Sequence, residues 1–213
     1  FILKDIEKNK LYEFLREMEF NRLLSSVISQ YGETKFSENN NVSKKQEINL
    51  KIDRKKYELV TNLEDIDRWL LDAEEKGELS IDTETTSLNP HLAELVGISL
   101  ATDIGKSCYI PLKHISKEVL DRNKVIRKIK PILEDKSIKK IGQNIKYDYI
   151  VFYHQGIRMN SMEDTMLISY VLDAGKNRHN MDTLSEIHLG HKTIQYKDLV
   201  GTGKKQLTFD QVE

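Results

Sequence analysis

Cysteine is nearly absent from the 213 residues, since Cys108 is the only one. A disulfide framework and a zinc site built from several cysteines are therefore excluded, and a single thiol suits a reducing compartment. Long hydrophobic runs are also missing, because no stretch approaches the roughly 20 apolar residues of a membrane span. A secretory signal is missing too: the opening FILKDIEKNK carries charges where such a signal is apolar. We expect a cytoplasmic protein without membrane contact and, because it begins with Phe1, a piece of a longer chain.

An excess of one charge is also lacking, because 33 basic and 34 acidic residues leave a net charge of -1. The charges are nevertheless segregated. Residues 62–84 hold nine acidic and two basic side chains, whereas residues 113–146 hold eleven basic and four acidic ones. A basic stretch suits a phosphate backbone and an acidic one suits divalent cations, but both patterns also occur on solvated helix faces. Charge alone leaves these alternatives open.

The spacing of apolar residues predicts two parts. Residues 2–31 have the periodicity of a helix or helix pair. A polar stretch with three consecutive asparagines, GETKFSENNNVSKKQE, follows and has little to bury. We therefore expect a helical segment over 1–31, a flexible linker over 32–52 and the main domain over 53–213.

The main domain reads as α/β, with a mixed sheet of three antiparallel strands and further crossover strands flanked by helices. Short turns between three of the strand-like runs favour antiparallel pairing of those runs. A helix over 61–76 is expected to begin with Thr61 as its N-cap. The predicted strands are 57–60, 78–83, 94–102, 106–112 and 138–142, and the other predicted helices are 116–134, 144–154, 162–174 and 181–189.

The sharpest local feature is IDTET at 81–85. On a strand Asp82 and Glu84 project to one face, while Ile81 and Thr83 face the other way. Two carboxylates this close repel each other, and without a set of cysteine and histidine ligands the natural partner is Mg²⁺ or Mn²⁺. A solvated acidic strand end is the usual alternative for an isolated D-x-E pattern.

A second polar cluster, GQNIKYD at 142–148, lies at another strand-to-helix transition. Asn144 and Asp148 are four residues apart, so on a helix they share one face. The cluster would add a carboxylate and an amide at the same edge of the sheet. A further acid, Asp164, directly precedes an apolar run and is predicted to cap the next helix.

The segments IDTETTSL, KKIGQNIKYD, EDTMLISYVLDAGKNRHNMDTL and HKTIQYKDLVGTGKKQLTF occur in this order in the chain. Together they resemble the 3′–5′ exonuclease (proofreading) domain of bacterial DNA polymerase I, of the DEDD exonuclease superfamily, over residues 53–213. The N-terminal LYEFLREMEFNRLL is similar to the end of the preceding 5′-nuclease region. The resemblance implies an RNase H-like fold, a part in DNA replication and repair, and a bacterial source.

The resemblance also implies residue roles. Two divalent ions, Mg²⁺ or Mn²⁺, would serve the hydrolysis of the 3′-terminal phosphodiester. Asp82 would contact both ions, Glu84 one of them and Asp148 the other. The 3′ end of single-stranded DNA would contact Leu88, Gln143, Asn144, Tyr147 and Arg178. The partner would be the polymerase domain of the same polypeptide, in a protein expected to be a monomer.

The family's third motif, Y-x-x-x-D, does not occur before Glu213. We therefore expect these 213 residues to bind metal weakly and to hydrolyse DNA slowly or not at all. Two alternatives stay open: a catalytically silent spacer that supports the polymerase domain, and an RNA-processing member of the same superfamily.

Overall fold

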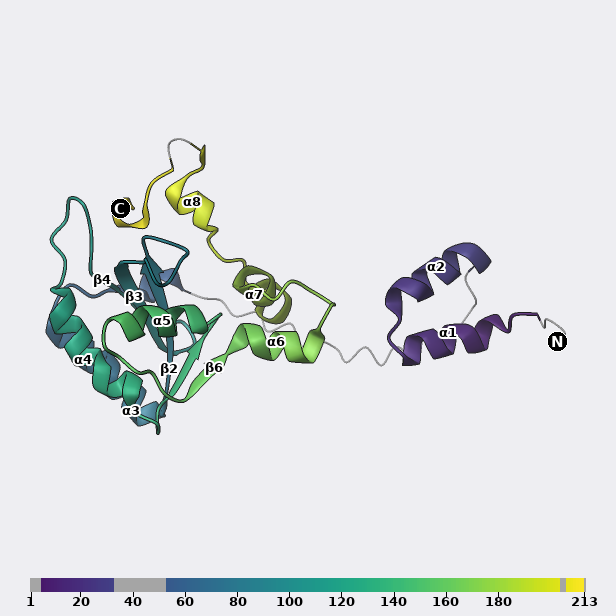
Figure 1. The fold of residues 1–213 in the computed structure, drawn as a ribbon, viewed down its shortest axis with the longest axis horizontal. Helices are drawn as coiled ribbons and strands as arrows, with labels where there is room; N and C mark the ends of the chain where they lie inside the picture. The colour runs from purple at the N-terminus through teal and green to yellow at the C-terminus, as the bar shows by residue number, and fades with distance from the viewer. Residues whose placement is uncertain (1–4, 33–52, 204–205, 213) are drawn as a thin grey trace. The chain divides into compact units, whose positions relative to one another are not determined.

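The computed structural model describes residues 5–32, 53–203 and 206–212 (Figure 1). The chain separates into two compact units, Phe1–Gln46 and Glu47–Glu213. The first contains helices α1 (Lys8–Glu17) and α2 (Asn21–Tyr31), which agrees with the predicted helix pair. The predicted linker over 32–52 lies outside the described residues except for Gly32, and the proposed domain boundaries stay a prediction.

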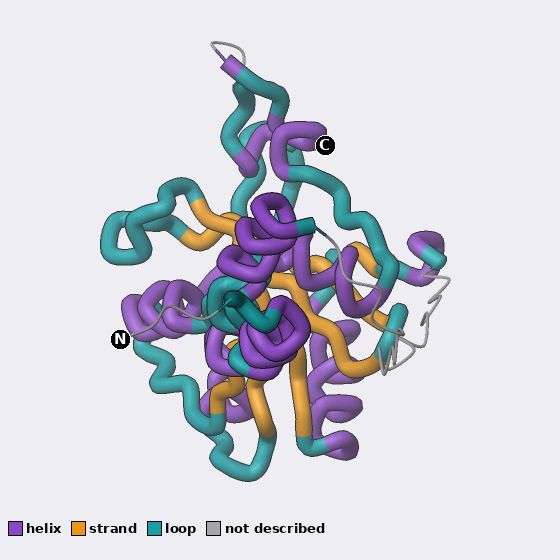
Figure 2. Tube along the Cα trace, turned by 90° about the vertical axis from the view of Figure 1, so that its right-hand side faces the viewer, coloured by secondary structure: helices purple, strands orange, loops and turns teal. Residues whose placement is uncertain are grey.

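The second unit is built on a six-stranded mixed sheet with the order β1-β4-β3-β2-β5-β6. The antiparallel pairs are β2 with β3 and β3 with β4, whereas β1, β5 and β6 each join a neighbour in parallel. The strands run side by side through the unit (orange in Figure 2). They are β1 (Glu58–Leu59), β2 (Glu78–Thr85), β3 (Leu95–Asp103), β4 (Lys106–Pro111), β5 (Lys139–Gly142) and β6 (Met162–Asp164). This arrangement confirms the predicted α/β fold of antiparallel strands with parallel crossover strands.

Helices make the parallel crossovers because parallel strands cannot be joined by a tight turn. These are α3 (Leu63–Lys76), α4 (Arg122–Glu134) and α5 (Lys146–His154). Their apolar sides share one hydrophobic cluster with the strands, in which Ile66, Ile81, Ile129 and Phe152 are all buried. Burying this apolar surface against the sheet is the main term that stabilises the unit.

Two helix starts differ from the sequence prediction. Asn62, rather than Thr61, caps α3 by accepting a hydrogen bond from the backbone N–H of Asp65 at 2.8 Å. Helix α4 begins at Arg122 instead of residue 116, and Asp121 caps it through the N–H of Lys124. In both cases a side-chain oxygen satisfies a backbone N–H that the helix itself leaves free.

The predicted helix over 162–174 is wrong in its first turn, because β6 occupies Met162–Asp164. Helix α6 (Thr165–Asp173) follows, and Asp164 caps it as predicted. Helix α7 (Met181–Leu189) has the predicted bounds. Further elements among the described residues are the helix α8 (Tyr196–Val200) and short 3₁₀ turns at Arg54–Lys56 and Phe209–Gln211. None of the helices that the structure describes combines the length and hydrophobicity that a membrane span requires.

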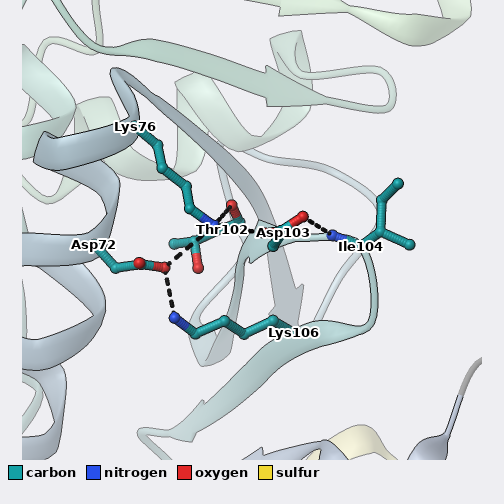
Figure 3. A network of polar contacts seen from close by, with 6 residues as sticks. All are labelled: Asp72, Lys76, Thr102, Asp103, Ile104 and Lys106. Carbon is teal, nitrogen blue, oxygen red and sulfur yellow. Dashed lines mark hydrogen bonds and ion pairs between the residues drawn. The ribbon is translucent and has the colours of Figure 1, made fainter.

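A polar network fastens the β3–β4 turn to α3 at the end of the sheet where β2 begins (Figure 3). The Lys76 ammonium group donates to the backbone oxygen of Thr102 at 2.8 Å and to Asp103 at 2.9 Å. Asp72, one turn earlier on α3, accepts from Lys106 of β4 at 2.8 Å. The network thus fixes the end of the hairpin that lies away from the acidic end of β2.

Lys140 is fully buried on β5. Its ammonium group donates to the backbone oxygens of Ile132, Asp135 and Ile138, at and just beyond the C-terminal end of α4. A cation at a helix C-terminus also interacts favourably with the helix dipole. Lys140 is therefore a cap for α4 rather than part of a basic surface.

Candidate active site

The end of β2 carries two carboxylates on one face of the sheet. Asp82 and Glu84 are half-buried, and they alternate with Ile81 and Thr83, which are buried. The alternation follows from the pleat of the strand, and Ile81 belongs to the core cluster beneath the helices. Asp82 and Glu84 therefore share the face opposite to Ile81 and Thr83, as the sequence predicts.

A third carboxylate reaches this strand from α5. Asp148 is 2% exposed, and its Oδ1 atom accepts hydrogen bonds from the backbone N–H of Thr83 at 2.9 Å and from the Thr83 hydroxyl at 2.6 Å. The register of β2 explains why this N–H is available: β5 pairs with β2 only from Glu78 to Ser80. Asp148 thus accepts from a backbone N–H of β2 that has no partner in β5, because β5 has ended.

The three carboxylates act on one another electrostatically. Burial raises the pKa of Glu84, and the charges of Asp82 and Asp148 raise it further, to about 7. Burial also raises the pKa of Asp148 to about 7, with a further contribution from Asp82 and an opposing one from the Thr83 hydrogen bonds. The pKa of Asp82 is raised by burial as well. A cluster of partly buried acids with raised pKa values is a common sign of a functional site.

The donor chemistry of this cluster fits a hard divalent cation, because oxygen ligands suit Mg²⁺ and Mn²⁺. As the side chains stand, however, no three histidine, cysteine, aspartate or glutamate residues within the described ranges are arranged to hold a metal ion. The hydrogen bonds from Thr83 occupy one oxygen of Asp148. The site therefore provides suitable donors without a preformed cage.

Tyr109 is a neighbour of the acidic cluster that the sequence analysis did not identify. Burial raises its pKa, and the nearby Glu84 carboxylate adds to the effect. The ring fits there because Gly97, between them on β3, has no side chain: a Cβ atom at Gly97 would lie 2.0 Å from the Tyr109 hydroxyl oxygen. Only the strand register shows that Tyr109 lies near Glu84. In that register, Gly97 of β3 pairs with Glu84 of β2 on one side and with Pro111 of β4 on the other.

A cavity of about 460 Å³ opens beside Glu84. Its lining includes the ring of Tyr109, the ring of Phe209 and the side chains of Lys113 and Lys117. The two rings meet edge to face, with centroids 6.3 Å apart. Next to the carboxylates, the structure thus places aromatic faces together with cationic groups.

The loop after β2, residues 86–94, contains one further predicted position, Leu88, and is contacted by another, Tyr147 of α5. Leu88 is 97% exposed and stands free of the core. The Tyr147 hydroxyl contacts the hydroxyl of Thr85 and donates to the backbone oxygen of Ser87. Tyr147 therefore fastens α5 to the start of this loop.

The remaining predicted contacts lie where β5 and β6 end. Gln143 donates to the backbone oxygen of His179 at 2.7 Å, which brings the exposed Arg178 close to the start of α5. Asn144 has a positive φ of 58° and precedes α5, so the predicted helical face shared with Asp148 is wrong. Its backbone N–H instead donates to Asp164 at 3.0 Å.

Comparison with known proteins identifies the family of this chain. The 3′–5′ exonuclease family matches residues 57–212. DNA polymerase I of Rhizobium leguminosarum is 42% identical over 185 residues, covering 77% of this chain and 18% of the relative. DNA polymerase I of Pseudomonas aeruginosa is 38% identical over 224 residues, covering 98% of this chain and 24% of the relative. The chain therefore spans less than a quarter of the length of these two relatives.

Solved structures share the fold at low sequence identity. Trypanosoma brucei RNase D superposes with a TM-score of 0.55 at 13% identity, covering 68% of this chain and 50% of that one. Escherichia coli RNase D superposes with a TM-score of 0.52 at 17% identity, covering 67% and 36% respectively. These similarities confirm the predicted RNase H-like fold.

Proposed function

The chain belongs to the 3′–5′ exonuclease family of DNA polymerase I, and we propose that it removes nucleotides from the 3′ end of single-stranded or frayed DNA by metal-dependent hydrolysis. The observation that carries this proposal is the hydrogen bonding of Asp148 to Thr83, the residue between Asp82 and Glu84 on β2, together with the raised pKa of all three acids. Ionised carboxylates this close repel each other in the metal-free protein, and bound cations would neutralise this repulsion. The cost of keeping these acids together thus supports a metal-binding role.

We propose that Asp82, Glu84 and Asp148 would together hold two divalent ions, Mg²⁺ or Mn²⁺. When bound, the ions supply Lewis-acid activation of water and stabilise the charge on the leaving oxygen. The chain's own contribution is to hold the carboxylates in place. Thr83 positions Asp148 through two hydrogen bonds, and β2 sets Asp82 and Glu84 on one face of the strand, on either side of Thr83 in the sequence.

The proposed strand contacts are Leu88 against the terminal base, and Gln143, Asn144, Tyr147 and Arg178 near the sugar and phosphates. The cavity beside Glu84 supports a nucleic-acid substrate, because aromatic rings stack on bases and lysines attract phosphates. Contacts of this kind position a strand without reading its sequence. Digestion is therefore expected at 3′ ends of any sequence.

The relatives are DNA polymerases more than four times as long as the part that matches here. We propose that the polymerase domain of the same polypeptide presents the 3′ end, and that the domain acts as a monomer in replication and repair. The expectation of slow hydrolysis by these 213 residues stays a prediction.

The test uses single-stranded DNA labelled at its 5′ end, incubated with Mn²⁺. The proposal predicts a ladder that shortens one nucleotide at a time from the 3′ end, at a low rate, and that disappears in Asp82→Ala. The matched control Asp198→Ala changes an exposed acid on α8 and should digest like wild type. Shortening that persists in Asp82→Ala or in EDTA would contradict the proposal.

A catalytically silent spacer is the second candidate. It is favoured by one observation: no three donors among the described residues are arranged as a metal cage. A spacer predicts that Mn²⁺ leaves the melting temperature unchanged, whereas a ligand of the native state raises it. No metal-dependent digestion and no thermal shift would together favour the spacer.

An RNA-processing role is a third candidate. The RNase D structures share the fold at 13% and 17% identity, which carries no preference for RNA. The DNA polymerase relatives favour DNA as the substrate. A competing RNA oligonucleotide of the same sequence, added to the DNA assay, should slow digestion less than unlabelled DNA does.

A further inference from the structure

Two histidines from separate elements meet on the surface. His91 lies in the 86–94 loop and His154 is the last residue of α5. The Nδ1 atom of His91 is 3.2 Å from the Nε2 atom of His154, and the two rings are nearly perpendicular, with centroids 5.4 Å apart. Both side chains are exposed, so the pair is open to solvent and to ions.

The hydrogen bond between the two nitrogens requires a lone pair on one of them and a proton on the other. A metal ion that displaces this proton would find two imidazole nitrogens within reach. Nitrogen ligands about 2.0–2.1 Å from a tetrahedral Zn²⁺ lie about 3.3–3.4 Å apart, close to the spacing seen here. We propose that His91 and His154 form a binding site for a transition-metal ion of the Zn²⁺, Ni²⁺ or Cu²⁺ type.

The expected ion differs from that of the carboxylate cluster. Imidazole nitrogen suits zinc, nickel and copper, whereas carboxylate oxygen suits magnesium and manganese. No third histidine, cysteine, aspartate or glutamate completes a metal-binding group within the ranges that the structure describes, so water fills the other positions. The site is thus a two-ligand surface site of modest affinity.

The surroundings orient both histidines. Asn89 accepts a hydrogen bond from the backbone N–H of His91 at 3.1 Å, which fixes the turn of the loop. The ring of Tyr153 packs edge to face against His154, with centroids 6.3 Å apart. The base of the loop is closed where the Thr86 N–H donates to the backbone oxygen of Glu94 at 3.0 Å. A bound ion would therefore join the loop to the end of α5.

The site is tested by metal binding to the whole 213-residue chain, which does not depend on nuclease activity. Zn²⁺ is titrated calorimetrically into wild type, His91→Ala and His154→Ala, all carrying Asp82→Ala to weaken binding at the carboxylate cluster. We expect one ion per chain in the parent and an affinity lower by at least about tenfold in each histidine variant. Substitution at two exposed positions should leave the fold intact, which circular dichroism checks.

Two further measurements decide the outcome. His188→Ala removes another exposed histidine and should bind Zn²⁺ like the parent. Cu²⁺ bound at one equivalent should show two nitrogen ligands by electron paramagnetic resonance, and the signal should be lost in either variant of the pair. Unchanged Zn²⁺ affinity in both His91→Ala and His154→Ala, or copper without two nitrogen ligands, would overturn the proposal.

Discussion

The Oδ1 atom of Asp148 accepts hydrogen bonds from both the backbone N–H and the hydroxyl of Thr83, 65 residues away in the sequence. This relationship joins α5 to β2 and sets the third carboxylate beside the pair on β2. Thr83 occupies the middle of the D-x-E pattern, where its side chain faces the helices rather than the acidic face. The residue between the two acids thus positions the third one.

Replacing Thr83 by valine should lower the free energy of unfolding by about 1–3 kcal/mol, because a buried carboxylate loses a hydroxyl donor. Valine keeps the shape and the backbone N–H, so only one of the two hydrogen bonds is removed. Urea denaturation measures the effect. Thr83→Ser retains the hydroxyl and should recover most of the loss, whereas equal stability of Thr83→Val and wild type would argue against this support.

The stability of the metal-free protein should fall as the pH rises. Glu84 and Asp148 have pKa values of about 7 in the folded chain, against about 4 for unfolded carboxyl groups. The folded chain therefore binds more protons, so this contribution to stability is complete below about pH 4 and is lost as the pH rises through about 7.

Urea midpoints in EDTA between pH 5 and pH 8 measure this dependence. Glu84→Gln removes one of the titrating groups, so the variant should lose less stability over this range than wild type does. Groups that do not interact with Glu84 titrate alike in both proteins, so their contribution cancels in the comparison. Parallel curves for the two proteins would show that Glu84 titrates normally.

Much of the active-site geometry follows from the sequence because it depends on local rules. Strand alternation alone sets Asp82 and Glu84 on one face, and short connections alone favour the antiparallel order of the three central strands. An aspartate before an apolar run is a helix cap, as Asp164 proves to be. Each of these predictions needs information from only a few neighbouring residues.

The features that were missed depend on distant parts of the chain. Strand β6 is three residues long and shows no alternation, so only its pairing with β5 reveals it. The place of Tyr109 depends on the absence of a side chain at Gly97, across a strand pair. The contact of Asp148 with Thr83 depends on where β5 ends. The pairing register and the strand lengths depend on the whole sheet. A pattern of a few neighbouring residues therefore does not predict them.

Lys140→Met should lower the free energy of unfolding by about 2–4 kcal/mol, because three backbone oxygens near the end of α4 lose their buried donor. Lys139→Met on the same strand is the matched control. Lys139 is partly exposed, and its ion pairs with Glu78 and Glu163 are at 3.9 and 3.5 Å, so its loss should cost less than about 1 kcal/mol. Similar losses for the two variants in thermal unfolding would contradict the capping role.

Gly97→Ala should displace the Tyr109 ring, because the new Cβ atom would lie 2.0 Å from the hydroxyl oxygen and 2.3 Å from Cζ. Overpacking of this kind costs about 1–3 kcal/mol of stability. In a Tyr109→Ala background, Gly97→Ala should cause a smaller loss of stability because the ring is gone. A double-mutant cycle of urea midpoints measures this difference. An equal cost of Gly97→Ala in both backgrounds would show that the ring is not what the methyl group meets.

The central claim is that Asp82, Glu84 and Asp148 together bind divalent cations, and Mn²⁺ titration followed by electron paramagnetic resonance tests it most directly. Wild type should bind Mn²⁺, and Asp82→Asn, Glu84→Gln and Asp148→Asn should each weaken binding by at least about tenfold. The exposed control Asp198→Asn should bind like wild type. If wild type binds Mn²⁺ no more tightly than the three site variants do, the three acids are not a metal site and the account is contradicted.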